Sequence, residues 1–348
     1  MVSRYIIQWM LIGFVLWPIS VVAEPDPLFR SQEPLKLDLS GPLRQLNRER
    51  NKSKIYSPAR LSYLAEDGSQ VSLSANLEVR GNYRKQMNVC RFTQLRVLLE
   101  QKPAEDSLFS NQSRLKLVTN CQPGKRTYQG YVLAEYLIYR MFNLLTDNSF
   151  RVRLVDMTYY DIAKNKRLHS SLGFFIEHKK RMAVRLNAKH VELHQVPRSA
   201  LDNYQTTLVA VFQFMVGNTD WSIRKGEKEE ECCHNAKLLE TADGRLLGIP
   251  YDFDFSGMVN AEYAFPTTGL PIRNVRQRYY RGFCQHNDSL NKVFALIRSR
   301  RDDIRALITE ERAIGAVQGK RALRYLRGFY DIIESPAMVE KKLTVTCR

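Results

Sequence analysis

Three short polar clusters in the second half of the sequence place oxygen ligands where helices and strands are expected to end. Asp220 follows an apolar helical pattern, Asn235 precedes a short strand, and Asp252 and Asp254 follow the next strand. Because a turn at residues 243–244 predicts a hairpin between these strands, we expect the clusters to converge in space. A carboxylate can orient a hydroxyl and accept its proton, and carboxylate and amide oxygens suit Mg²⁺ or Mn²⁺. The combination favours phosphoryl transfer.

The rest of the sequence predicts a β-rich first half and a helical second half. Residues 58–180 alternate apolar and polar side chains around an Asp67-Gly68 turn, with one helical pattern at residues 131–146. From about Pro197 the apolar spacing becomes helical, apart from the predicted hairpin. Residues 24–57 are polar and contain four prolines, so we expect a linker or an extended arm there. These patterns together predict an α+β fold.

The first 23 residues resemble a secretory signal peptide. Arg4 supplies the positive start, an apolar run extends to Val22, and Ala23 ends a group of small residues where a signal peptidase would cut. An uncleaved membrane anchor is the alternative, since the run is just long enough to span a bilayer. No later stretch has that length, so we expect no transmembrane segment after signal removal. The mature chain should be exported, either to a periplasm or out of the cell.

Six cysteines follow the signal-like segment, and an even number in an exported chain favours disulfides. Cys90 and Cys121 both lie in the β-rich half and are predicted to pair. A metal site is the alternative. Cys232, Cys233 and His234 are too closely spaced to form a tetrahedral zinc site by themselves.

The formal net charge of +17 is large, and loss of Arg4 with the signal would leave +16. Such an excess favours anionic partners, namely a nucleotide, an acidic protein or an anionic envelope surface. The basic residues are scattered along the chain, so a solvated basic face is an alternative interpretation. Export argues against a nucleic acid as the partner.

Residues 217–257 resemble the kinase core of the spore-coat CotH kinase family, an atypical branch of the protein-kinase-like fold. The stretches that carry the resemblance are GNTDW, HNAKLL and GIPYDFDFSG, with VRGNYRK and GFFIEHKK upstream. The resemblance spans roughly residues 80–257. It implies a bilobal α+β protein, with a β-rich N-lobe that contains one helix at residues 58–180 and a helical C-lobe at residues 181–348.

The resemblance also implies roles for individual residues. Asp220 would be the catalytic base, and Asn235, Asp252 and Asp254 would bind the Mg²⁺ or Mn²⁺ ion. Glu135, on the single helix of the β-rich half, would pair with an ATP-binding lysine, for which Lys116 is the candidate. Glu177 would lie beside the adenine. The full set of residues expected to contact ATP is Arg80, Asn82, Lys116, Glu135 and Glu177.

The leading prediction is an exported kinase that transfers phosphate from ATP to a hydroxyl of a protein or an envelope glycan. One alternative is a non-catalytic module that holds an anion or a partner in a basic cleft. Stabilisation by ATP and Mn²⁺ would separate these two, because a ligand of the native state raises its stability. A second alternative is a metal-dependent glycosyltransferase in which Asp252 and Asp254 form the sugar-nucleotide motif. No Rossmann-like βαβ series precedes that motif, which argues against it.

Overall fold

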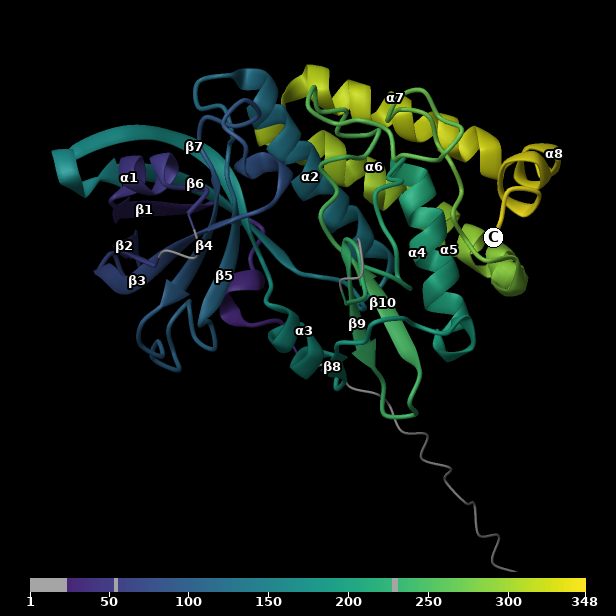
Figure 1. Cartoon of the computed structure of the whole chain (residues 1–348), viewed down its shortest axis with the longest axis horizontal. Coiled ribbons are helices and arrows are strands. Elements are labelled where there is room, and N and C mark those ends of the chain that lie inside the picture. The colour runs from purple at the N-terminus through teal and green to yellow at the C-terminus, as the bar shows by residue number, and fades with distance from the viewer. Residues whose placement is uncertain (1–23, 53–55, 227–230) are drawn as a thin grey trace, which may run out of the picture.

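The computed structural model describes residues 24–52, 56–226 and 231–348, and the predicted signal peptide lies outside them. A closed barrel of seven strands forms the N-terminal half, and a helical region with a small sheet lies beside it (Figure 1). The barrel order is β1-β2-β3-β4-β5-β7-β6, closed by parallel pairing of β1 with β6. The strands are β1 (Leu35–Gly41), β2 (Ser57–Leu64), β3 (Gln70–Arg80), β4 (Gln94–Leu99), β5 (Arg114–Val118), β6 (Val152–Asp161) and β7 (Lys166–Ile176).

Alternating side chains fill the interior of this barrel. In β1, Leu37 and Leu39 are buried while Lys36 and Asp38 are exposed. The buried leucines join an apolar cluster to which every barrel strand contributes. The predicted hairpin turn is confirmed, since β2 pairs with β3 across it and Gly68 adopts a φ of +81° that favours glycine.

The closed barrel shows that the predicted bilobal, protein-kinase-like fold is wrong. The expectation was a β-rich N-lobe with one helix at residues 58–180, preceded by a linker or extended arm at residues 24–57. That preceding segment contains β1 and a short helix, α1 (Leu43–Arg48). Because β1 pairs with both β2 and β6, the sheet has no free edge. Only three leucines alternate along β1, so the polar, proline-rich composition of the segment concealed this strand.

Helix α2 (Arg126–Leu145) also departs from the expected division into two lobes. Its buried side chains, such as Leu137 and Phe142, belong to the same apolar cluster as α4 and the C-terminal helices. The barrel interior forms a separate cluster. Figure 1 shows α2 between the barrel and the C-terminal helices. The helix expected to belong to the N-lobe therefore shares its core with the second half of the chain.

The second half combines helices with a three-stranded sheet of order β10-β9-β8. The predicted hairpin is confirmed as β9 and β10, and the predicted end of α4 is confirmed at Gly217, which has a φ of +67°. The strands are β8 (Lys189–Val191), β9 (Ala236–Glu240) and β10 (Leu246–Pro250). The helices are α3 (Lys179–Arg185), α4 (Asn203–Val216), α5 (Leu290–Ser299), α6 (Arg301–Glu310), α7 (Gly315–Ile333) and α8 (Pro336–Val339).

All six cysteines are paired, in the disulfides Cys90–Cys121, Cys232–Cys233 and Cys284–Cys347. The first of these was predicted from the sequence and is confirmed. Three disulfides fit a protein of an oxidising, extracellular environment. Among the described residues, no helix is long and apolar enough to cross a bilayer.

Candidate functional site

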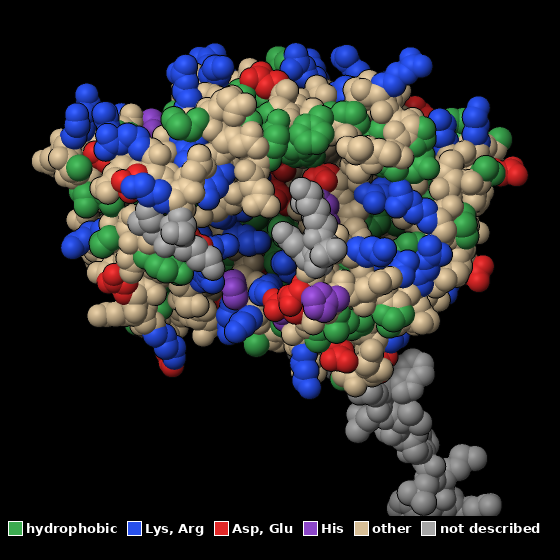
Figure 2. Space-filling view, in the orientation of Figure 1, with side chains coloured by type: hydrophobic (Ala, Val, Ile, Leu, Met, Phe, Trp, Pro, Cys, Tyr) green, Lys and Arg blue, Asp and Glu red, His purple; other side chains and the backbone are tan. Residues whose placement is uncertain are grey.

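The candidate site lies where the barrel meets the helical region. The barrel contributes the ends of β3 and β5, and the other half contributes α2, the turn after α4 and one edge of the β9–β10 hairpin. Figure 2 shows that this face of the molecule is hollowed near its centre, with Lys or Arg and Asp or Glu side chains in the hollow. The three polar clusters identified in the sequence meet at this junction.

Asp220 is held in a defined orientation by side chains from both sides. Its backbone N–H donates to Asn218 Oδ1 at 3.0 Å, which fixes the turn after α4. His234 Nε2 lies 2.7 Å from Asp220 Oδ1, and Asn235 Nδ2 donates to Oδ2 at 3.0 Å and to the carbonyl oxygen at 2.7 Å. The carboxylate is nevertheless 31% exposed. A positioned and accessible carboxylate can accept a proton from a bound hydroxyl.

Asn235 and Asp252 lie at the same edge of the β9–β10 hairpin. Ala236 pairs with Pro250 in the ladder, and the Tyr251 N–H donates to the Asn235 carbonyl at 3.0 Å. Both residues adopt left-handed backbone conformations, with φ of +48° for Asn235 and +63° for Asp252. Such conformations are unfavourable outside glycine and concentrate at functional sites. The hairpin thus places Asp252 one residue after the partner of Asn235, and Asn235 in turn contacts Asp220.

Arg84 is the central cation of the site, and it pairs with three carboxylates. Its Nη1 lies 3.3 Å from Glu135, its Nη2 lies 3.0 Å from Asp252 and its Nε lies 3.1 Å from Asp254. Arg84, Glu135 and Asp254 are almost fully buried, whereas the Asp252 side chain is 30% exposed. The guanidinium therefore joins the β3–β4 connection to α2 and to the segment after β10.

Burial and charge set opposite pKa shifts on these carboxyl groups. Burial raises the pKa of Asp254 well above its usual range, and nearby Asp252 adds to the shift although Arg84 opposes it. Burial likewise raises the pKa of Glu135 to about 7, against the attraction of Arg84. For Asp252, burial works in the same direction, but Arg84, Arg80 and Lys116 together outweigh it and lower the pKa. Asp252 is therefore the carboxyl group of the three that ionises most readily.

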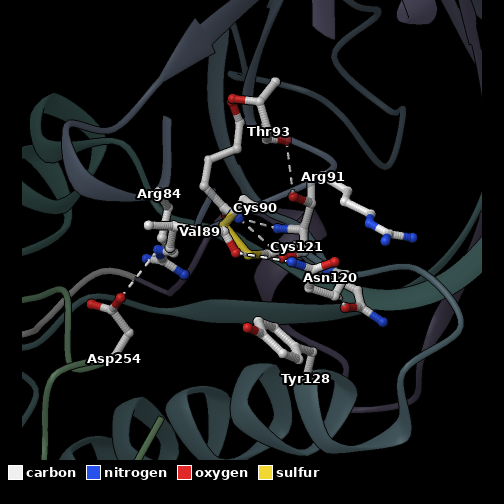
Figure 3. The surroundings of a disulfide bond; sticks show 12 residues. Arg84, Val89, Cys90, Arg91, Thr93, Asn120, Cys121, Tyr128 and Asp254 are labelled. Carbon is white, nitrogen blue, oxygen red and sulfur yellow. Dashed lines mark hydrogen bonds and ion pairs between the residues drawn. A yellow bond between two sulfur atoms is a disulfide. The ribbon is translucent and has the colours of Figure 1, made fainter. Parts of the chain in front are cut away.

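A disulfide holds the segment that carries Arg84. Figure 3 shows Arg84 close to the Cys90–Cys121 bond and pointing toward Asp254. The bond ties the end of the β3–β4 connection to the segment before α2. It therefore restrains the connection on the C-terminal side of the turn that contains Arg84. Arg84 was not among the site residues predicted from the sequence. The signal available was its place two residues after Asn82, in a turn already expected to contact ATP.

Lys116 and Arg80 line the barrel side of the junction. Lys116 Nζ lies 4.2 Å from the centre of the ring of Tyr251, the residue that precedes Asp252. Burial lowers the pKa of Lys116 to about 7, and repulsion by Arg80 and Lys237 adds to this shift. The Nε of Arg80 is buried and has no hydrogen-bond partner within the described part of the chain. These cations face the acidic edge without forming the expected pair.

The remaining predicted ATP contacts have other partners. The ion-pair partner of Glu135 is Arg84, whereas Lys116 had been expected in that position. Glu177 is buried, and both of its oxygens accept from Arg185, at 3.0 and 2.9 Å. Asn82 is exposed at the start of the turn that contains Arg84. Glu177 therefore anchors α3 to the end of β7, and its carboxylate is already satisfied.

Neither a protein-family model nor a curated protein matches this sequence. The resemblance to the CotH family consequently rests on the residues quoted above. The geometry of the junction, considered on its own, carries the functional argument that follows.

Proposed function

We propose that this chain is an exported enzyme that transfers the terminal phosphate of ATP to a hydroxyl of a protein or glycan acceptor. The observation that carries the proposal is the accessible Asp220 carboxylate, which is oriented by His234 and Asn235 at the same hairpin edge as Asp252. Cations from the barrel face this edge. The three disulfides support export, because they persist in oxidising compartments.

In the proposed reaction, Asp220 accepts the proton of the acceptor hydroxyl as its oxygen forms a bond to the terminal phosphorus. The bond from that phosphorus to the bridging oxygen breaks, and ADP leaves with the electron pair. His234 keeps the Asp220 carboxylate oriented through its contact at 2.7 Å. Lys116 and Arg80 would contact phosphate oxygens, since their charges lie beside Asp252 and lack carboxylate partners within the described residues.

The residues present fit a divalent cation in part. Asp252 pairs with Arg84 through Oδ1 and its side chain also hydrogen-bonds that of Asp254. Asn235 uses its amide nitrogen for Asp220, which leaves its carbonyl oxygen. Asp252 and Asn235 would hold Mg²⁺ or Mn²⁺, which would neutralise phosphate charge when bound. Asp254 is bound to Arg84, so its expected role as a further ligand is the least supported.

A second candidate function is a non-catalytic module that binds an anion. The specific observation in its favour is the Arg84 cluster, in which one guanidinium already compensates carboxylates that a cation would otherwise hold. In that case the cations of the junction would bind an anionic ligand, and Asp220 would have no catalytic role.

The deciding experiment measures ATP binding and phosphate transfer on the full chain. We expect ATP with Mn²⁺ to raise the melting temperature, and labelled phosphate to reach the protein itself or a generic acceptor. The Asp220→Asn variant is the matched control, which should retain ATP binding and lose transfer. ATP binding without transfer in the wild type would favour the non-catalytic module. Stabilisation by a sugar nucleotide and not by ATP would favour the glycosyltransferase.

A further inference from the structure

A basic pocket of about 220 Å³ adjoins the candidate site and is lined only by residues of the second half of the chain. It begins directly after Asp220, because Trp221 and Ser222 form part of its wall. Phe283 and Ile223 supply apolar surface. The charged residues that line it are Arg198, Arg224, Lys225, Arg281 and Arg348, with no acidic residue among them.

No Asp or Glu side chain lies within ion-pair distance of these cations in the part of the chain that the structure describes. Backbone carbonyls hold several of them in place. Arg281 donates to the Thr219 carbonyl, Arg224 Nε donates to Val196 at 2.9 Å, and Arg198 Nη1 donates to Arg348 at 3.3 Å. These bonds orient the guanidinium groups while leaving most of their positive charge uncompensated.

Aromatic rings and a disulfide add to this positioning. The Arg281 guanidinium lies 5.6 Å from the centre of the Trp221 ring, and that of Arg198 lies 4.8 Å from the centre of the Phe283 ring. Arginine stacks well on aromatic faces, which restricts its rotamers. The Cys284–Cys347 bond brings Arg348 next to Arg281, and the Arg348 N–H donates to Gly282 at 2.9 Å.

Arg281 is buried in this pocket close to a second cation, Arg348. Burial and repulsion by Arg348 lower the pKa of the Arg281 guanidinium to about 10, although Asp220 opposes the shift. Its Nε is buried and has no hydrogen-bond partner within the described residues. A bound anion would neutralise the positive charge shared by Arg281 and Arg348, and it would supply a hydrogen-bond acceptor for Arg281 Nε.

We propose that this pocket binds a phosphate or sulfate group that the acceptor already carries, adjacent to the hydroxyl presented to Asp220. The assignment of the ligand as part of an acceptor rests on the proposed phosphotransfer. Tetrahedral oxyanions match several converging guanidinium and ammonium donors, because arginine forks bind two oxygens at once. The enzyme would then act on acceptors that already carry a negative charge.

The first test measures the affinity for inorganic phosphate and for sulfate by calorimetry at constant ionic strength. We expect Lys225→Gln and Arg224→Gln each to weaken binding by about tenfold, the loss typical of one charge-assisted hydrogen bond. Lys225 is exposed and its side chain makes no hydrogen bond or ion pair with the described residues, so Lys225→Gln should fold normally. Lys164→Gln, on the exposed turn between β6 and β7, makes the same charge change outside the pocket and should leave the affinity unchanged.

Two results of this measurement would overturn the pocket. One is the absence of phosphate and sulfate binding to the wild type. The other is a loss in Lys164→Gln equal to that in Lys225→Gln, which would mean that only net charge matters. A loss caused by Lys116→Met and not by Lys225→Gln would also overturn it, since the anion would then occupy the junction with the barrel.

The second test separates this inference from the proposed function. With ATP as donor, kcat/KM is compared for glucose, glucose 6-phosphate and glucose 6-sulfate, and the two charged sugars distinguish phosphate from sulfate. We expect the charged sugars to be preferred, and Lys225→Gln to reduce that preference by about tenfold. Transfer without any preference would overturn the inference and keep the proposed function. Anion binding that depends on Lys225 without any ATP binding would overturn the function and keep an anion-binding pocket.

Discussion

Arg84 Nε lies 3.1 Å from Asp254 Oδ2, in contact with a carboxyl group that is 170 residues further along the chain and almost fully buried. The same guanidinium also reaches Glu135 on α2 and Asp252. One side chain from the barrel therefore compensates the acidic groups of the other half. The contact is a structural connection between the two halves as well as a part of the candidate site.

Replacing Arg84 with methionine should strongly destabilise the fold. Removal of one partner of a buried ion pair leaves uncompensated charge and typically costs about 3–5 kcal/mol in the free energy of unfolding. Urea unfolding of Arg84→Met against the wild type measures this directly. Arg91→Met, an exposed arginine of the same connection, is the matched control and should change stability by no more than about 0.5 kcal/mol. Equal stability of Arg84→Met and wild type would contradict the compensation.

Asp220→Asn and Asp252→Asn should have different effects on function. Asp220→Asn should reduce kcat by about 10²–10⁴-fold, the contribution typical of general base catalysis, with ATP affinity little changed. Asp252→Asn should abolish metal-dependent nucleotide binding, because it removes an ionised oxygen ligand beside Arg84. Equilibrium binding and single-turnover transfer separate the two effects. Loss of ATP binding in Asp220→Asn would argue against its role as base.

Lys116→Met should be more stable than the wild type below about pH 7, and its advantage should shrink at higher pH. Burial lowers the pKa of Lys116 to about 7 from its ordinary 10.5, so the unfolded chain binds more protons between these values. Wild-type stability contributed by this group therefore rises with pH through that window. Urea unfolding at pH 6 and at pH 9 measures the change. Exposed Lys164→Met should show no such dependence, and a constant difference for Lys116→Met would contradict the burial of the cation.

Removing the Cys90–Cys121 bond should destabilise the protein and loosen Arg84. The two cysteines are 31 residues apart, so loss of the cross-link should cost about 4 kcal/mol through the entropy of the unfolded chain. The double variant Cys90→Ser/Cys121→Ser, studied by urea unfolding, tests the first part. Hydrogen exchange of the variant and the wild type tests the second part. We expect exchange in the turn at residues 81–88 to be faster in the variant, and exchange in β9 to be unchanged. Unchanged exchange in that turn would show that other contacts hold it.

The hairpins and the convergence of the polar clusters could be predicted because their signals are local. Glycines at residues 68 and 244 mark the turns, alternating apolar residues mark β2 and β3, and short apolar runs mark β9 and β10. Once β9 and β10 pair, the positions of Asn235 and Asp252 at one edge follow from the register. The proximity of Asp220 then needs only the helix end at Gly217.

The barrel closure and the Arg84 cluster could not be predicted because both depend on contacts between distant segments. Nothing in the three leucines of β1 indicates that β6 is its parallel partner. Nothing in the spacing of Arg84 and Glu135 indicates that they pair. The local sequence around an arginine does not show whether its side chain will be buried or exposed. Lys116 was predicted to pair with Glu135, but in the structure the ion-pair partner of Glu135 is Arg84.

The parallel pairing of β1 with β6 has a consequence for the order in which the protein can form. Leu39 pairs with Tyr159, so the first strand to leave the ribosome cannot complete the barrel until most of the first half has been synthesised. Contacts between segments so far apart in sequence slow folding, because the chain between them must be ordered before they form. Until then, β1 and β6 each present an open edge that can pair with another chain. Because β7 lies between β5 and β6 in the barrel, a nascent chain of this protein should be a client of holding chaperones until residue 176 has emerged.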